Sequence, residues 1–194
     1  MVETKNIMLN RRQVVQTLLN ERKNCLVVSG LGSATYDVHS VGDNETNFYL
    51  WGGMGGAAMI GLGLAIAQPQ KTVLVITGDG EQLMGLGSIA TISIKKPKNL
   101  MIIVLDNEHF GETGMQESHT FHNVDLVGIA KASGCKSSFL VRDKKSLDQL
   151  MKIKKTLSCF TFAVIKVSEN LEKRSLPIVN GSRIKIRFKK SMNL

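Results

Sequence analysis

The sequence VLVITGDG, residues 73–80, decides the fold class. Four apolar residues lead into Thr77 and then into Asp79, which stands between two glycines. A short, continuous apolar run of this kind is typical of a strand buried on both faces of a parallel sheet. Glycines permit a tight turn and a close backbone approach. We therefore expect the Asp79 carboxylate to lie just beyond the carboxyl end of a buried strand.

Strands and helices alternate on both sides of this stretch. The hydrophobic pattern predicts strands at residues 25–28, 48–50, 72–77, 99–105, 139–141 and 160–167. It predicts helices at residues 10–23, 57–67, 81–94, 126–133 and 144–155, with a further helix through Tyr36 and Val38. Such alternation favours the α/β class, with a mostly parallel sheet flanked by helices on both faces.

The chain reads as one domain with a basic tail. No linker rich in Pro, Ser or Gly divides its 194 residues, so we expect a domain over residues 1–168 and a basic C-terminal tail over residues 169–194. Lys and Arg number 25 against 16 Asp and Glu, giving a net charge of +9. The basic residues form short clusters without an RNA-recognition or zinc-finger pattern, so we expect a solvated basic face and no nucleic-acid partner.

Cysteine spacing and hydropathy bear on the compartment. Cys25, Cys135 and Cys159 are far apart and odd in number, which argues against a disulfide framework and against a CxxC metal or redox site. The most apolar run, residues 57–67, is about half as long as a membrane helix. We expect a soluble protein of the reducing cytoplasm with no membrane partner.

Three loops that follow predicted strands carry small or oxygen-bearing residues. They span residues 30–33, 78–80 and 106–111. In open α/β sheets, ligands bind beyond the carboxyl ends of the strands. Carboxylate, amide and carbonyl oxygens suit Mg²⁺ or Ca²⁺ better than a soft metal. A Gly-Asp-Gly turn by itself is also a common solvated turn, so the spacing to the other loops has to decide.

The spacing between two of these loops identifies a family. From Gly80, 25 residues lead to Asp106 and Asn107, at the end of the apolar stretch LMIIVLDN, and WGGMGGA precedes the Gly-Asp-Gly turn at residues 51–57. This arrangement resembles the cofactor-binding signature of thiamine-diphosphate-dependent enzymes. The resemblance implies the diphosphate-binding domain of that family and its two cofactors, thiamine diphosphate and Mg²⁺.

The resemblance assigns roles to individual residues. It implies that Mg²⁺ is held by the Asp79 and Asn107 side chains and by the backbone carbonyl of His109. It further implies that Met54 props the cofactor in its bent form, for which helix-start packing is the plain alternative. The residues implied in cofactor binding are Gly30, Gly32, Ser33, Gly52, Met54, Gly78, Asp79, Gly80, Glu81 and Asn107.

Glu81 departs from the family pattern, which often has a small residue at this position. The resemblance implies that the N–H groups of Gly80 and Glu81 cradle the diphosphate together with residues 30–33. We therefore expect the Glu81 side chain to point away from the phosphates.

The loop LDNEHFGETGMQESHT, residues 105–120, is similar to the corresponding loop of sulfopyruvate and phosphonopyruvate decarboxylases. It departs from them at residues 112–116, where a Ser and a Gly are replaced. The resemblance implies decarboxylation of a small 2-oxo acid, with His109, Gln116 and His119 facing the substrate as proton donors or anion binders. The spacing of His119 and His122 also permits a zinc pair, but no further ligand cluster supports it.

The activating glutamate of the family belongs to a second, pyrimidine-binding domain, and we find no stretch here that could form it. The resemblance therefore implies a partner α subunit, in a heterodimer or an α2β2 assembly. Alternatives remain open. They are another thiamine-diphosphate enzyme (acetolactate synthase-like, or 2-oxoacid oxidoreductase-like although clustered cysteines are lacking) and a non-catalytic regulatory subunit. A dinucleotide site at residues 30–35 matches poorly, because Thr35 replaces the third glycine.

Overall fold

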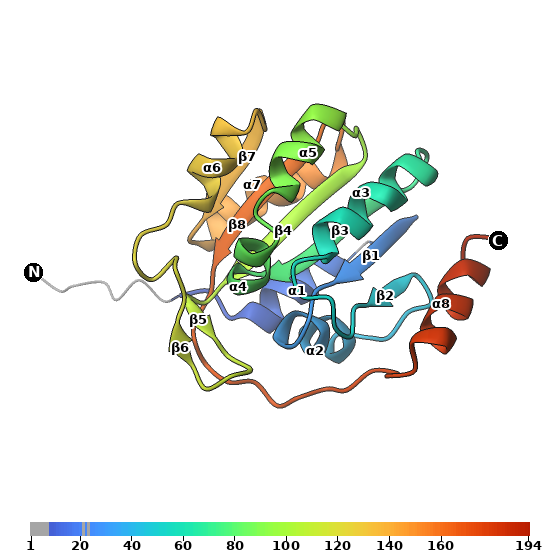
Figure 1. The fold of residues 1–194 in the computed structure, drawn as a ribbon, viewed down its shortest axis with the longest axis horizontal. Helices are drawn as coiled ribbons and strands as arrows, with labels where there is room; N and C mark the ends of the chain where they lie inside the picture. The colour runs from blue at the N-terminus through green and yellow to red at the C-terminus, as the bar shows by residue number, and fades with distance from the viewer. Residues whose placement is uncertain (1–7, 21, 23) are drawn as a thin grey trace, which may run out of the picture.

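The computed structural model describes residues 8–20, 22 and 24–194 and contains a six-stranded sheet in which all neighbouring strands are parallel (Figure 1). The strand order is β2-β1-β3-β4-β8-β7. The strands are β1 (Cys25–Ser29), β2 (Asn47–Tyr49), β3 (Thr72–Gly78), β4 (Leu100–Asp106), β7 (Ser137–Val141) and β8 (Thr161–Lys166). A separate antiparallel hairpin is formed by β5 (His109–Phe110) and β6 (Gln116–Glu117). The prediction of a parallel α/β fold is confirmed.

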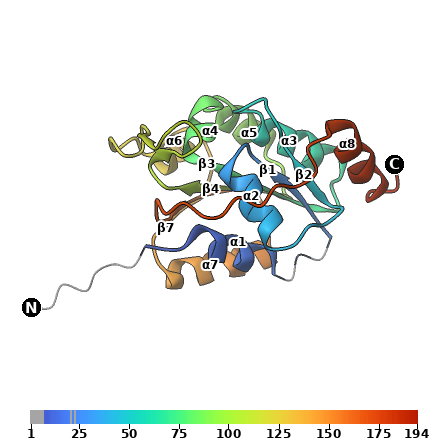
Figure 2. The same ribbon diagram turned by 90° about the horizontal axis from the view of Figure 1, so that it is seen from below.

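Helices cover both faces of the sheet, as Figure 2 shows. On one face lie α1 (Arg11–Leu19), α2 (Ser33–Ser40) and α7 (Lys144–Lys155). On the other lie α3 (Ala57–Ala67), α5 (Ser88–Lys95) and α6 (Leu126–Ala132). Successive residues of β3 explain the two layers, because Leu74 and Ile76 pack into the first core while Val73 and Val75 pack into the second. The continuous apolar strand is therefore buried on both sides.

The prediction of one helix over residues 81–94 is wrong. The structure has α4 (Asp79–Met84) and α5, separated by residues 85–87. Gly85 lies against the backbone of Gly55, so closely that a β-carbon at residue 85 would overlap the Gly55 carbonyl oxygen. The helix ends where this contact forms. The predicted helix over residues 10–23 ends at Leu19, and residues 21 and 23 lie outside the described residues.

Residues after 168 return along the carboxyl edge of the sheet and end in α8 (Gly181–Lys190), beside β2 (Figure 1). Ile184 and Phe188 of α8 are buried, and the ring centroid of Phe188 lies 5.4 Å from that of Phe48 in β2. The basic segment thus carries an amphipathic helix that packs on the domain. Of the helices formed by the described residues, none has the length and apolar character needed to span a membrane.

Candidate functional site

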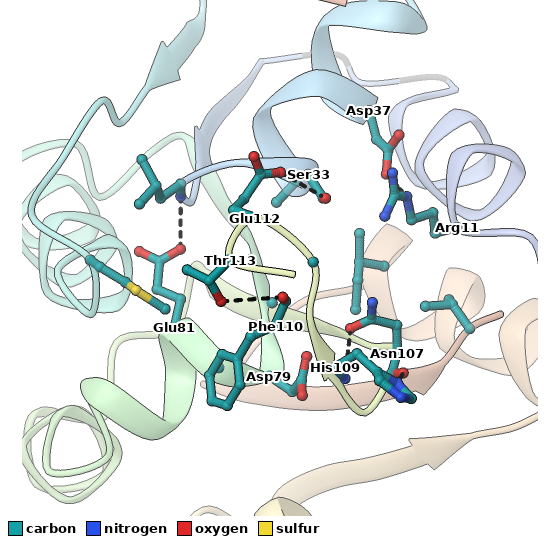
Figure 3. A pocket seen from close by; sticks show the side chains of 18 residues that line it. Arg11, Ser33, Asp37, Asp79, Glu81, Asn107, His109, Phe110, Glu112 and Thr113 are labelled. Atoms are coloured by element: carbon teal, nitrogen blue, oxygen red, sulfur yellow. Dashed lines mark hydrogen bonds and ion pairs between the residues drawn. The ribbon is translucent and has the colours of Figure 1, made fainter. Parts of the chain in front are cut away.

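A pocket lies at the carboxyl ends of β1, β3 and β4 (Figure 3). The chain leaves β1 toward β2 on one side and returns to β3 on the other, so this edge contains the point where strand order reverses. Such points are the usual ligand sites of open α/β sheets. Of the residues proposed from the sequence, those that line the pocket are Ser33, Met54, Gly78, Asp79, Gly80, Glu81, Asn107 and His109.

Asp79 begins α4 directly beyond β3 and is only 2% exposed. Its Oδ2 atom accepts hydrogen bonds from the hydroxyl groups of Ser118 and, at 3.2 Å, Thr120. Burial raises the pKa of Asp79 to about 6, with the nearby charge of Asp106 adding to the rise and the two hydroxyl groups opposing it. The side chain is thus a buried carboxyl group with one well-bonded oxygen.

Oxygen atoms converge between Asp79 and the end of β4. The Asn107 side-chain oxygen lies 2.9 Å from the His109 carbonyl oxygen and 3.2 Å from Asp79 Oδ1. Oxygens cannot hydrogen-bond to one another, so either the amide turns and donates its NH₂ group to both, or a cation lies among the three. Carboxylate, amide and carbonyl oxygens form a donor set that suits Mg²⁺. The three atoms implied as metal ligands therefore fit that ion.

The end of β4 is fixed by an ion pair from the neighbouring strand. Lys166 of β8 places its Nζ atom 2.7 Å from Asp106 Oδ2 and also contacts Glu108. The Thr120 hydroxyl lies 2.8 Å from the other Asp106 oxygen and 3.2 Å from Asp79, so its one proton is shared between the two carboxyl groups. These contacts hold the backbone on either side of Asn107, which directs its amide toward Asp79 (Figure 3).

Glu81 is 4% exposed and turns toward the loop after β1. Its Oε2 atom accepts a hydrogen bond of 2.9 Å from the Leu31 N–H, drawn as a dashed line to Glu81 in Figure 3, and another of 2.9 Å from the Thr77 hydroxyl. Burial raises the pKa of Glu81, and hydrogen bonds from Thr77 and from backbone N–H groups oppose the rise. A β-carbon at Gly30 would collide with this carboxylate, which explains the glycine there.

The glycine-rich segment, residues 52–56, forms another wall. Gly52, Gly53 and Gly55 have φ values of 94°, 63° and 91°, in the left-handed region that favours glycine. Met54 between them is 37% exposed and lines the pocket. Gly52, two residues before Met54, does not line the pocket.

The hairpin β5–β6 covers part of the pocket. Phe110 packs its ring against Gly80, where a β-carbon would collide with it. His109 lines the pocket with its ring Nδ1 atom 2.9 Å from the Asn107 carbonyl oxygen. Gln116 and His119 are exposed, and neither lines the pocket. Among the predicted substrate-facing residues, the structure brings only His109 to the pocket.

The alternative of a zinc pair at His119 and His122 gains no support. His122 lies 3.3 Å from Glu117, and His119 packs near the Phe110 ring. In the part of the chain that the structure describes, no three His, Cys, Asp or Glu side chains gather as a metal cluster would require.

The sequence reasoning missed Ser118, Thr120, Lys166 and Glu112. Ser118 and Thr120 are buried in a polar loop, and no local pattern separates them from their exposed neighbours. Lys166 is the last residue of β8, and its position in a predicted strand gave no sign that it pairs with Asp106. Glu112 lines the pocket and accepts a 3.3 Å hydrogen bond from Ser33, at a position where the sequence showed only a departure from the similar loops.

Comparison with known proteins shows the family. Residues 30–167 match the sequence profile of the thiamine pyrophosphate enzyme C-terminal TPP binding domain. The chain belongs to this family. The match spans all three of the loops that form the pocket and ends at the last strand of the sheet.

Several relatives of this chain are named decarboxylases. Sulfopyruvate decarboxylase subunit beta of Methanococcus maripaludis is 33% identical over 93% of this chain and 96% of its own length. The subunit beta of Methanocaldococcus jannaschii is 46% identical over 56% of this chain and 57% of its own length. The sulfopyruvate decarboxylase of Methanosarcina acetivorans is 33% identical over 95% of this chain but only 47% of its own length. The chain thus spans about half of the length of each of the latter two relatives.

Solved structures agree with the fold. The X-ray structure of a putative thiamin diphosphate-dependent enzyme from Mycobacterium smegmatis superposes with a TM-score of 0.71 at 21% identity, over 84% of this chain and 32% of that one. At this identity the likeness concerns the fold alone. It confirms that the sheet and its flanking helices have the arrangement of such a domain.

Proposed function

We propose that this chain is one subunit of a two-component 2-oxo acid decarboxylase that depends on thiamine diphosphate and Mg²⁺. The observation that carries the proposal is the convergence of the Asp79 carboxylate, the Asn107 side-chain amide and the His109 carbonyl at the ends of β3 and β4. The names of the relatives, sulfopyruvate decarboxylase subunits beta, support the type of reaction and a small 2-oxo acid substrate.

The residues of this chain would bind and orient the cofactor. Asp79, Asn107 and the His109 carbonyl would hold Mg²⁺ against the diphosphate, beside backbone from residues 30–33 and 78–81. Met54 would support the bent cofactor, and the Gly52 carbonyl would accept a hydrogen bond from its aminopyrimidine. Once bound, thiamine diphosphate supplies the carbon nucleophile and electron sink for loss of CO₂. His109 lines the pocket and is the best placed of the predicted polar side chains to meet a substrate.

A partner α subunit would complete the site by providing the pyrimidine-binding domain and the activating glutamate. Two observations support this: relatives of similar length are named subunit beta, and the relative from M. acetivorans is about twice as long as the matched region. We infer a heterodimer or an α2β2 assembly. The free cysteines Cys25, Cys135 and Cys159 are consistent with the cytoplasm as its compartment.

Co-expression with the adjacent gene product tests the proposal. The purified pair should bind thiamine diphosphate only with Mg²⁺ and should release CO₂ from a member of a panel containing sulfopyruvate, phosphonopyruvate and pyruvate. Asp79→Ala should abolish both. Unchanged binding by this variant, or no binding by the pair, would contradict the cofactor assignment. Full activity of this chain alone would contradict the split site, and formation of acetolactate from pyruvate would indicate a synthase instead.

A further inference from the structure

The side chain of Glu81 has no role in the cofactor contacts proposed above, yet it is buried beside them. It extends from the first turn of α4 to the junction of three segments. Oε2 accepts the Leu31 N–H from the loop after β1 and the Thr77 hydroxyl at the end of β3, each at 2.9 Å. One carboxylate oxygen therefore ties two of the pocket's walls together.

The third segment is the glycine-rich segment. The N–H groups of Gly55 and Ala57 face the same carboxyl group and favour its charged form. Neither forms a full hydrogen bond with the buried Oε1 atom, which has no hydrogen-bond partner among the described residues. Together with the Thr77 hydroxyl and the Leu31 N–H, these groups oppose the rise that burial causes in the pKa of Glu81.

Close packing shows that the junction is specific. Gly30 is the residue that allows the carboxylate to approach the loop, since any β-carbon there would overlap Oε2. On the other side, Gly55 lies in contact with the backbone of Gly85 at the end of α4. The helix that bears Glu81 is therefore fixed at its first turn to the loop after β1 and at its C-cap, Gly85, to the glycine-rich segment.

We propose that the Glu81 side chain is a positioning residue that sets the spacing between the diphosphate cradle and Met54. This inference rests on the proposed function, in which residues 30–33 hold the diphosphate and residues 52–54 hold the aminopyrimidine end. Binding both ends of one cofactor requires their two segments to be held at a fixed separation. The Glu81 side chain joins those segments, while its backbone N–H belongs to the proposed diphosphate cradle.

Two ligands that differ in how many of the two segments they contact test the role of Glu81. Thiamine diphosphate contacts both segments, whereas inorganic pyrophosphate contacts only the diphosphate cradle. The full chain, purified with its partner subunit, is titrated calorimetrically with each ligand in the presence of Mg²⁺. Glu81→Ala should lower the affinity for thiamine diphosphate by about 10- to 100-fold, as removal of supporting contacts commonly does. It should lower the affinity for pyrophosphate by a clearly smaller factor.

Further variants separate positioning from folding. Glu81→Gln keeps an oxygen for Leu31 and Thr77 but loses the charge facing Gly55 and Ala57. Its affinity for thiamine diphosphate should therefore lie between those of the wild type and Glu81→Ala. Thr77→Val removes one contact and serves if Glu81→Ala does not fold. Glu45→Ala, at an exposed glutamate, should leave both affinities unchanged.

The ratio of the two affinities is the deciding quantity, because a purely structural role would weaken both ligands equally. An unchanged ratio in Glu81→Ala and Glu81→Gln would overturn the inference while leaving the proposed function intact. Failure of the wild-type complex to bind thiamine diphosphate at all would instead overturn the proposed function, and the inference with it.

Discussion

Asp79 combines deep burial with a proposed role as a metal ligand, and the two make opposite demands on its charge. Burial raises the pKa of Asp79 to about 6 from an ordinary value of 3.8. A carboxyl group whose pKa is higher in the folded state favours folding most when it is protonated, so this contribution to stability is lost as pH rises through about 6. Mg²⁺ bound as proposed would reverse the preference, since only the ionised form is a ligand.

We therefore expect Mg²⁺ affinity to fall by about tenfold per pH unit below about pH 6. The thermal shift produced by Mg²⁺ should accordingly be larger at about pH 7.5 than at about pH 5. Asp79→Asn provides the control and should show a small Mg²⁺ shift at both pH values. A wild-type shift that does not change with pH would contradict the raised pKa.

Lys166 is the cation that balances Asp106 next to this site. Replacing Lys166 by Met leaves a carboxylate that is 1% exposed without its partner. Because loss of one member of a buried pair uncovers a desolvated charge, we expect the free energy of unfolding to fall by about 3 kcal/mol. Urea denaturation of the full chain measures this.

Lys144→Met is the matched control for Lys166→Met. Its partner Asp148 lies 3.6 Å away at the surface, and the Lys144 and Asp148 side chains are 81% and 56% exposed. We expect a change within about 0.5 kcal/mol. Equal effects of the two substitutions would show that the Lys166 pair is not buried as described.

At the scale of elements, the break between α4 and α5 follows from one backbone contact. Gly85→Ala should force the end of α4 away from Gly55 and cost about 1–3 kcal/mol, as overpacking does. Gly87 lies two residues away with open space around its α-carbon, so Gly87→Ala should be neutral. Chemical denaturation distinguishes them, and a neutral Gly85→Ala would mean that the turn is set by some other contact.

Helix α8 offers a similar pair of neighbouring positions. Phe188 is 4% exposed and packs into the second core, whereas Ile186 is 63% exposed. Phe188→Ala should lower the free energy of unfolding by about 3 kcal/mol, and Ile186→Ala should leave it within about 0.5 kcal/mol. Similar values for both would indicate that α8 does not stay on the domain in solution.

For the whole molecule, the sequence predicted those features that depend on the pattern of residues close together in the chain. The apolar runs predicted the six strands of the sheet, and the recurrence of Asp79 and Asn107 at strand ends predicted which edge carries the site. It could not predict that residues 85–87 interrupt a helix, because the cause is Gly55, thirty residues earlier. The roles of Ser118 and Thr120 could not be predicted for the same reason, since their hydrogen-bond partners Asp79 and Asp106 are distant in sequence.

Charge gave the least information about the molecule. The basic residues after 168 suggested a solvated tail, but their spacing also places Ile184 and Phe188 on one face of α8, and both are buried. Arg187 on the same helix lies 2.6 Å from Asp43. A count of charges does not contain the period that makes a helix amphipathic.

The position of α8 has a consequence for self-association. Strand β2 is an outer strand of the sheet, and an outer strand presents unpaired backbone groups to which another chain can add. Arg187 donates a 3.4 Å hydrogen bond to the carbonyl of Asn47 in β2, and Phe188 covers Phe48 beside it. The C-terminal helix thus occupies the place where a foreign strand would dock. A chain ending before Gly181 should form oligomers by edge-to-edge pairing, visible as a concentration-dependent mass in light scattering.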